Sequence, residues 1–333
     1  VSSWNEAAPC NISLRRQADA AKRGVTAAGG TPREFTTITV TDGIAMGHAG
    51  MKSSLVSRET IADSVELTVR GHTYDALVAI GGCDKALPGL MMAMVRLDVP
   101  SVFLYGGSIM PGRYQGRDVT VLDVFEGVGK HSAGKMTLAE LTALEKVACP
   151  GAGSCGGQYT ANSMAYVSEA IGLALPGSAS PPAVLESRDI YAERAGEAVM
   201  RLLRDGPRPR QIVTRKSLEN AAAVVAATGG STNATLHLPA LAHEAGIAFD
   251  LFDVDKSEAR TAPVDVLFDQ LITFQLEPLK AATKAVHDAE AALAKKNNDK
   301  ARALLKEARD LIAAMPVNET QASSAEIRGA FTG

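Results

Sequence analysis

The feature that most constrains the fold is an apolar run that leads through a Gly-rich turn into a helix. Residues 76–80 are apolar and predict a buried strand of a parallel sheet. The turn that follows, Gly81-Gly82-Cys83-Asp84-Lys85-Ala86-Leu87-Pro88-Gly89, places a thiol, a carboxylate and an amine in consecutive positions. Open α/β sheets bind ligands at such turns, beyond the carboxyl ends of their strands. A tight turn with incidental polar residues is the alternative interpretation.

The same pattern recurs along the first three quarters of the chain. Further strands are predicted at residues 35–40 and 99–105. Helices are predicted up to about residue 24 and at residues 57–71, 119–130, 137–147, 161–173, 191–203 and 217–227. Strand, Gly-rich turn and helix recurring over about 30 residues is typical of βαβ units. We therefore predict an α/β domain over residues 1–255, with parallel sheet flanked by helices.

The last part of the chain differs in composition. Residues 264–315 contain no strand pattern, few glycines and abundant Ala, Lys and Glu. Two apolar stripes, one at Val286, Ala289 and Leu293 and the other between Ala301 and Ile312, predict an α-helical hairpin. We expect residues 256–333 to form this hairpin and a polar tail, with an unknown role.

Composition excludes several classes of protein. A formal net charge of -3 and an aromatic content of 5% argue against nucleic acid as a partner. No apolar run approaches the roughly 18 residues that span a bilayer, so no membrane segment is expected. Four cysteines in 333 residues are too few for a secreted disulfide scaffold, and the first residues do not resemble a signal peptide. We expect a cytoplasmic protein, or an organellar matrix protein in a eukaryote.

Three of the cysteines lie in loops. Cys10, Cys83 and Cys155 each stand among Gly, Pro or Asn residues, and none lies on a predicted helix face. Their separations are too long for a C-x-x-C zinc site. Three soft thiolates suit an iron–sulfur cluster that leaves one iron position open for substrate. A catalytic cysteine with His48 or His131 as its base is the alternative.

Oxygen ligands accompany these thiols. Asp42 and Asp84 both lie at predicted strand ends, and carboxylates are the ligands that Mg²⁺ prefers. Lys85 suits a cation site only if its charge is removed, because an ammonium repels a metal ion. Carbamylation of Lys85 would remove that charge and provide an anionic oxygen ligand.

The segment Cys83 to Ala93 resembles the first signature of the dihydroxy-acid dehydratase and phosphogluconate dehydratase family. The resemblance runs from Trp4 to about Asp255 and includes Pro9-Cys10-Asn11 and residues 41–47, 150–157, 176–182 and 229–233. Between these motifs the sequence is closer to the dihydroxy-acid branch. The resemblance implies that Cys10, Cys83 and Cys155 bind a [2Fe–2S] cluster. It also implies that Asp42, Asp84 and carbamylated Lys85 bind Mg²⁺.

The resemblance also implies a reaction. Enzymes of this branch are hydro-lyases that dehydrate a 2,3-dihydroxy-3-methyl carboxylate to a 2-keto acid in branched-chain amino-acid synthesis. The open iron would act as a Lewis acid on the leaving 3-hydroxyl, and Mg²⁺ would hold the carboxylate and the 2-hydroxyl. A homodimer that acts on a small dihydroxy acid, with neither nucleic acid nor membrane as a partner, is expected.

The sequence departs from the family after the α/β part. The family continues into a β-rich domain, which provides a further Mg²⁺ carboxylate and a serine base within a motif like T-D-G-R-x-S-G. That motif does not occur in these 333 residues, because Thr41-Asp42-Gly43 is followed by Ile44. The catalytic base is therefore unassigned. A sugar-acid dehydratase (aldonate or phosphogluconate) and a non-catalytic cluster- or acid-binding protein on the same scaffold are the alternatives.

Overall fold

The computed structural model describes residues 1–249, 288 and 298–314. The chain divides into two compact units, residues 1–257 and 258–333, and each is described separately. In the first unit the elements, in chain order, are α1 (Leu14–Ala27), α2 (Asp42–Ala45), the 3-10 helix η1 (Ala49–Met51), α3 (Lys52–Gly71), β1 (Leu77–Gly81), α4 (Ala86–Leu97), β2 (Ser101–Tyr105), β3 (Gly112–Tyr114), β4 (Arg117–Val119), α5 (Val121–Ser132), α6 (Leu138–Ala148), α7 (Thr160–Ile171), α8 (Glu186–Asp205), α9 (Pro209–Ile212), α10 (Arg215–Ala227) and α11 (Ala234–Ala245).

A short parallel sheet lies at the centre of this unit. Strands β1 and β2 pair in register from Leu77 opposite Ser101 to Gly81 opposite Tyr105, which confirms two of the predicted strands. Single bridges extend the sheet, from Ser2 to Ile80 and from Phe103 to Ala174. The α/β class is therefore compatible with the structure, although the chain is mostly helical.

The prediction of a strand at residues 35–40 is wrong. Only Thr36 forms a bridge there, to Ser2, through hydrogen bonds that join residues 35 and 37 to Ser2. The β-rich composition of the segment favours an extended backbone, but a ladder needs a partner of equal length. Within the described residues, that partner is the short segment around Ser2, so no strand develops.

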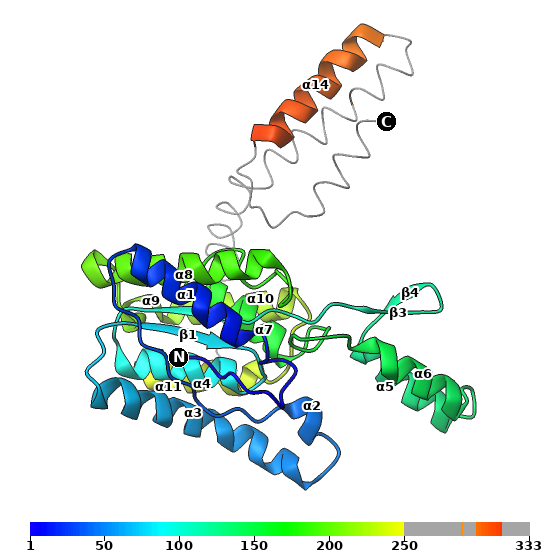
Figure 1. Cartoon of the computed structure of the whole chain (residues 1–333), viewed down its shortest axis with the longest axis horizontal. Coiled ribbons are helices and arrows are strands. Elements are labelled where there is room, and N and C mark those ends of the chain that lie inside the picture. The colour runs from blue at the N-terminus through cyan, green and yellow to red at the C-terminus, as the bar shows by residue number, and fades with distance from the viewer. Residues whose placement is uncertain (250–287, 289–297, 315–333) are drawn as a thin grey trace. The chain divides into compact units, whose positions relative to one another are not determined.

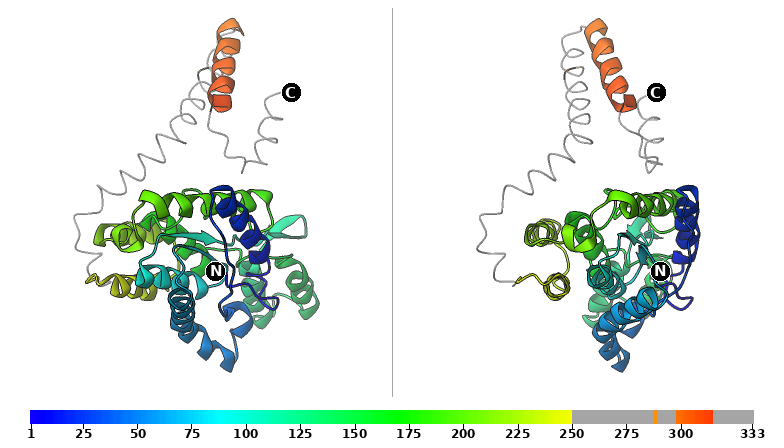
Figure 2. Two further views of the ribbon diagram at one scale, coloured as in Figure 1. Left: turned by 60° about the vertical axis from the view of Figure 1, so that its left-hand side comes forward. Right: turned by 90° about the vertical axis from the view of Figure 1, so that its left-hand side faces the viewer.

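Helices cover both faces of the sheet (Figures 1 and 2). Side chains alternate across a strand, so Ala79 and Phe103 face the layer of α3, α4 and α7, whereas Ile80 and Leu104 face α1 and α8. Helix α4 is buried almost all round, which is why its sequence reads Leu-Met-Met-Ala-Met-Val without polar positions. This layering places the turn after β1 at one end of the core.

Two features of the connecting segments follow from local sequence. Thr137 caps α6 and forms a capping box with Glu140, as the spacing of these two residues at the start of the helix predicts. The hairpin of β3 and β4 was not predicted, because its strands have only three residues each. Its turn has positive φ at Gln115 (49°) and Gly116 (82°), as a tight two-residue hairpin requires.

In the second unit the structure describes α14 (Asn298–Ala314). The second apolar stripe, between Ala301 and Ile312, lies in this helix, and the hairpin stays a prediction. The first half of the predicted hairpin lies outside the described residues. Among the residues that the structure describes, no helix is both long and apolar enough to cross a membrane.

Glycines let α1 and α8 approach closely. A Cβ at Gly24 would lie 1.9 Å from the carbonyl oxygen of Glu193, and one at Gly196 would lie 2.1 Å from that of Ala21. The helix, predicted up to about residue 24, continues to Ala27, so Gly24 lies inside it. The two backbones therefore meet where neither helix has a side chain.

We predict that Gly24→Ala destabilises the protein by about 1–3 kcal/mol, because the new methyl group forces the two backbones apart. Gly129→Ala is the matched control, since Gly129 lies inside α5 with nothing within 4 Å of its missing Cβ. That change should stabilise by roughly 0.5–1 kcal/mol. Urea unfolding followed by circular dichroism measures both. Equal stability of the two variants would contradict the packing argument.

Candidate functional site

Three loops meet beyond the carboxyl ends of β1 and β2, and each carries one of the predicted thiols. The Gly153 N–H donates to the carbonyl of Pro9 (3.0 Å), and the Ser154 N–H donates to the carbonyl of Gly107 (2.9 Å). The Ser154 hydroxyl donates to the carbonyl of Gly82. These bonds connect the loop of Cys155 to the loops of Cys10 and Cys83.

The approach of these loops depends on two glycines. A Cβ at Gly82 would lie 2.1 Å from the carbonyl oxygen of Cys10. Gly153 has a φ of +138°, and its Cβ would lie 2.4 Å from the backbone nitrogen of Ile109. Side chains at either position would push the loops apart, so the Gly-rich sequence is a packing requirement.

The thiols of Cys10 and Cys83 are brought together in a buried cluster with Ala8. The contact between the two thiols raises the pKa of Cys10 and lowers the pKa of Cys83. The Cys10 sulfur also lies 3.6 Å from the Thr41 hydroxyl. A thiolate at Cys83 is the form that binds a metal.

Cys155 joins this pair from the rim of the site. Cys155 is exposed, but partial desolvation raises the pKa of its thiol to about 11. The charges of Cys83 and Asp84 raise this pKa further. With the side chains as they stand, the described part of the chain contains no group of three or more His, Cys, Asp or Glu that converges on a metal position. The structure therefore pairs two of the predicted thiols and places the third in the adjoining loop.

The predicted Mg²⁺ ligands form a buried ion-pair triad. Lys85 Nζ lies 3.0 Å from Asp42 Oδ2 and 2.7 Å from Asp84 Oδ2. Burial and the charge of Asp42 raise the pKa of Asp84 to about 6. Burial also disfavours the charge on Asp42, but its bonds with Asp84, Ser54 and Lys85 outweigh burial and lower its pKa. The ammonium of Lys85 thus lies between the two carboxylates.

Sequence reasoning missed several residues around this triad. The Ser54 hydroxyl donates to Asp42 Oδ1 at 2.5 Å. One turn later on α3, Arg58 Nη1 lies 3.1 Å from Nδ1 of His237, a ring that is fully buried. Asn11, next to Cys10, is fully buried with no partner at either side-chain atom. The spacing of Ser54 and Arg58 was the one sequence signal for these contacts. That spacing is typical of any helix face, so it does not indicate a site.

The alternative of a cysteine nucleophile activated by histidine finds no support in the geometry. His48 bonds to the carbonyl of Ile44 and the N–H of Gly50 and is exposed. His131 bonds to the carbonyl of Met136 and is also exposed. Neither ring has a cysteine among its hydrogen-bond partners, so neither is placed to take a thiol proton.

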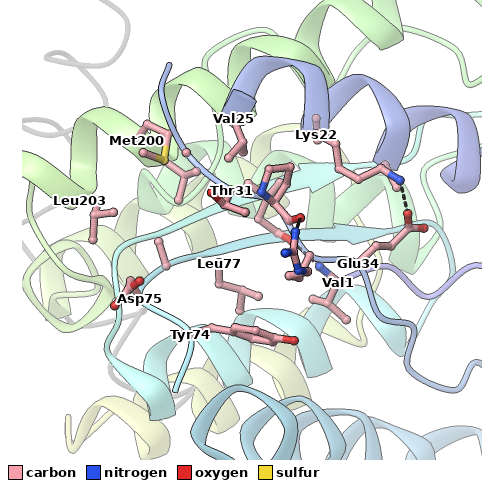
Figure 3. A pocket seen from close by; sticks show the side chains of 18 of the residues that line it. Val1, Lys22, Val25, Thr31, Glu34, Tyr74, Asp75, Leu77, Met200 and Leu203 are labelled. Atoms are coloured by element: carbon pink, nitrogen blue, oxygen red, sulfur yellow. Dashed lines mark hydrogen bonds and ion pairs between the residues drawn. The ribbon is translucent and has the colours of Figure 1, made fainter. Parts of the chain in front are cut away.

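A cavity lies away from these residues. Its volume is about 380 Å³. Side chains such as Val25, Leu77 and Met200, from α1, β1 and α8, line it (Figure 3). None of the six predicted ligands lines it. The candidate site is therefore the junction of loops, and not this cavity.

We predict that Lys85→Met destabilises the metal-free chain by about 3–5 kcal/mol, because it leaves two buried carboxylates without a counter-charge. Lys22→Met is the control, since Lys22 also contacts two carboxylates, Asp19 (2.7 Å) and Glu34 (2.5 Å), but at the surface. That change should cost at most about 1 kcal/mol. Thermal and urea unfolding compare the two. Similar losses in both variants would contradict a buried triad.

His237 gives a pH prediction. Burial, with the charges of Arg58 and Lys85, lowers its pKa from 6.5 to about 3, so the unfolded chain binds the proton more readily between these values. This contribution to stability is complete above pH 6.5 and is lost as the pH falls. Between pH 7 and pH 5 the loss is about 2 kcal/mol. Urea unfolding of wild type and His237→Gln at both values should show a smaller pH dependence in the variant. An equal dependence would rule out a buried neutral ring.

Comparison with known proteins agrees with this arrangement. The family model for the N-terminal part of dihydroxy-acid/6-phosphogluconate dehydratases matches residues 1–267. The chain is 73% identical over 261 residues to a dihydroxy-acid dehydratase of Pelagibacter ubique, covering 78% of the chain and 46% of that protein. It is 74% identical over 251 residues to that of Parvibaculum lavamentivorans, covering 75% of the chain and 44% of that protein.

A more distant relative shows the same coverage. Dihydroxy-acid dehydratase 2 of Bordetella bronchiseptica is 61% identical over 262 residues, which are 78% of this chain and 46% of that enzyme. The chain thus spans about half the length of the curated relatives that it matches. On the match to residues 1–267, the chain belongs to the dihydroxy-acid/6-phosphogluconate dehydratase family.

Proposed function

We propose that this chain provides the cluster- and Mg²⁺-binding part of a dihydroxy-acid dehydratase. The reaction is the dehydration of a 2,3-dihydroxy-3-methyl carboxylate to a 2-keto acid, by a hydro-lyase of branched-chain amino-acid synthesis. The observation that carries the proposal is the convergence of two thiols and an Asp–Lys–Asp triad on the turn after β1. The relatives named above are dihydroxy-acid dehydratases, which favours this substrate class over sugar acids.

The donor set fits an iron–sulfur cluster. Cys10 and Cys83 are in contact, and this contact lowers the pKa of Cys83, which favours a thiolate there. Cys155 lies in a loop bonded to theirs and is exposed, so it has room to move. Three thiolates and no further protein ligand leave one coordination position for a substrate oxygen. We propose Cys10, Cys83 and Cys155 as the ligands of a [2Fe–2S] cluster.

The triad fits a magnesium ion in the same way. Asp84 Oδ1 is buried with no hydrogen-bond partner, as expected of an oxygen that binds a cation when one is present. Asp42 is held in place by Ser54 and Lys85. We propose Asp42, Asp84 and carbamylated Lys85 as the Mg²⁺ ligands. When bound, the two metal groups would supply Lewis acidity for loss of the hydroxyl and for charge on the enolate.

The chain's own residues would position these groups and keep water out. Gly82 lets the Cys10 loop approach the turn after β1, and Ser154 bonds the third loop to the same glycine. The proton-abstracting base is not assigned to any residue in this chain. A homodimer and a cytoplasmic location remain expectations from the resemblance.

Anaerobic reconstitution with iron and sulfide tests the cluster. We expect the wild-type chain to retain iron and sulfide with visible absorption, and Cys83→Ala to lose both. Cys149→Ala is the matched control, because Cys149 lies at the end of α6 and is not a proposed ligand. The proposal is wrong if wild type retains no iron, or if Cys83→Ala retains as much as Cys149→Ala.

An assay of 2-keto acid formation from the dihydroxy acid, with Mg²⁺ present, tests the reaction. Turnover by the reconstituted chain that Cys83→Ala abolishes would support the full proposal. Turnover that survives loss of the cluster would contradict it. Aldonates serve as the comparison substrates, and preference for an aldonate would overturn the substrate class.

A further inference from the structure

The protonation state of His237 follows from its neighbour. Its Nδ1 lies 3.1 Å from Nη1 of Arg58, and the ring is 0% exposed. A guanidinium has only donors, so Nδ1 must accept this bond. With the ring neutral, the proton is on Nε2. His237 is therefore fixed as a donor at Nε2.

That donor has no acceptor. Nε2 of His237 is buried and has no hydrogen-bond partner. A buried polar group without a partner costs roughly 1–3 kcal/mol, so such groups are rare in folded proteins. An acceptor that forms or binds next to the ring would remove this cost.

The ring lies next to the Asp–Lys–Asp triad. Ser54, which donates to Asp42 at 2.5 Å, and Arg58, which bonds to His237, are one turn apart on α3 and share a face. Helix α11, which carries His237, packs against α4, which begins directly after Lys85. The charges of Lys85 and Asp42 both affect the pKa of His237, in opposite directions.

We propose that His237 is a positioning residue of this site, whose Nε2–H donates a hydrogen bond to a carbamate oxygen on Lys85. The inference rests on the proposed function, in which Lys85 is carbamylated. The ammonium of Lys85 first loses one proton to water, and the resulting neutral amine attacks the carbon of CO₂ and forms an N–C bond. One C=O electron pair moves to oxygen, and one proton leaves the nitrogen to water. The product is an N-linked carboxylate.

Carbamylation of Lys85 would give His237 Nε2–H a hydrogen-bond acceptor that the unmodified lysine does not offer. Before it, Lys85 offers only N–H donors, which cannot accept a bond from His237. After it, the same side chain ends in two anionic oxygens, and bonds from a neutral donor to a charged acceptor are among the stronger ones. His237 would thus stabilise the modified lysine and not the free amine.

Carbon-13 NMR of the 333-residue chain in labelled bicarbonate with Mg²⁺ measures the carbamate directly. Lys85→Ala should abolish the signal in the carbamate region. His237→Leu should weaken the apparent affinity for CO₂ about tenfold, the loss expected for one hydrogen bond to a charged group. His237→Gln, which keeps an N–H donor, should recover part of it. His243→Leu is the matched control, since His243 is exposed in the last turn of the same helix.

The outcomes separate the two proposals. If wild type shows no carbamate that depends on Lys85, this inference is overturned, while iron uptake by the cysteines still tests the cluster. If the carbamate forms with equal affinity in wild type, His237→Leu and His237→Gln, only the role of His237 is overturned. If His237→Leu does not fold by circular dichroism, the comparison of His237→Gln with His243→Leu decides, and equal affinities in those two overturn the role.

Discussion

The contact between the Cys10 loop and Gly82 sets the geometry of the whole site. The carbonyl of Cys10 occupies the space that a side chain at position 82 would fill. Gly82 follows β1 directly, so the loop is positioned by the strand and through it by the core. The hydroxyl of Ser154 bonds to the same glycine and brings in the third loop. Gly82, together with Gly153 in the third loop, thus allows the three cysteine-bearing loops to approach one another.

The electrostatic arrangement depends on that positioning. The turn after β1 brings Asp84 and Lys85 to Asp42, which belongs to a separate helix and is fixed there by Ser54. Opposite charges offset burial, and two buried atoms near these charges, Asp84 Oδ1 and His237 Nε2, have no hydrogen-bond partner. Arg188 shows the contrast: it is buried too, but its guanidinium bonds to backbone carbonyls of Tyr105, Ser178 and Pro181 and serves the fold.

Sequence reasoning could predict what is local. The strand, the Gly-rich turn and the helix around Cys83 follow from periodicity, and the cap at Thr137 follows from residue spacing. The strand expected at residues 35–40 failed because pairing depends on a partner elsewhere in the chain. The contact between Arg58 and His237 could not be predicted for the same reason, because 179 positions separate the two residues. Close packing at Gly24 could likewise not be predicted, because the partner, Glu193, lies far away in the sequence.

The ammonium of Lys85 has a consequence for the order of assembly. It supplies positive charge between two buried carboxylates before any metal arrives, so the carboxylates do not repel one another in the newly folded chain. Folding therefore need not wait for metal, unlike small domains in which the ion is the core. In the proposed Mg²⁺ site, this internal cation would have to be neutralised before a metal ion could bind. Maturation would then consist of two events, folding of the chain and modification of Lys85.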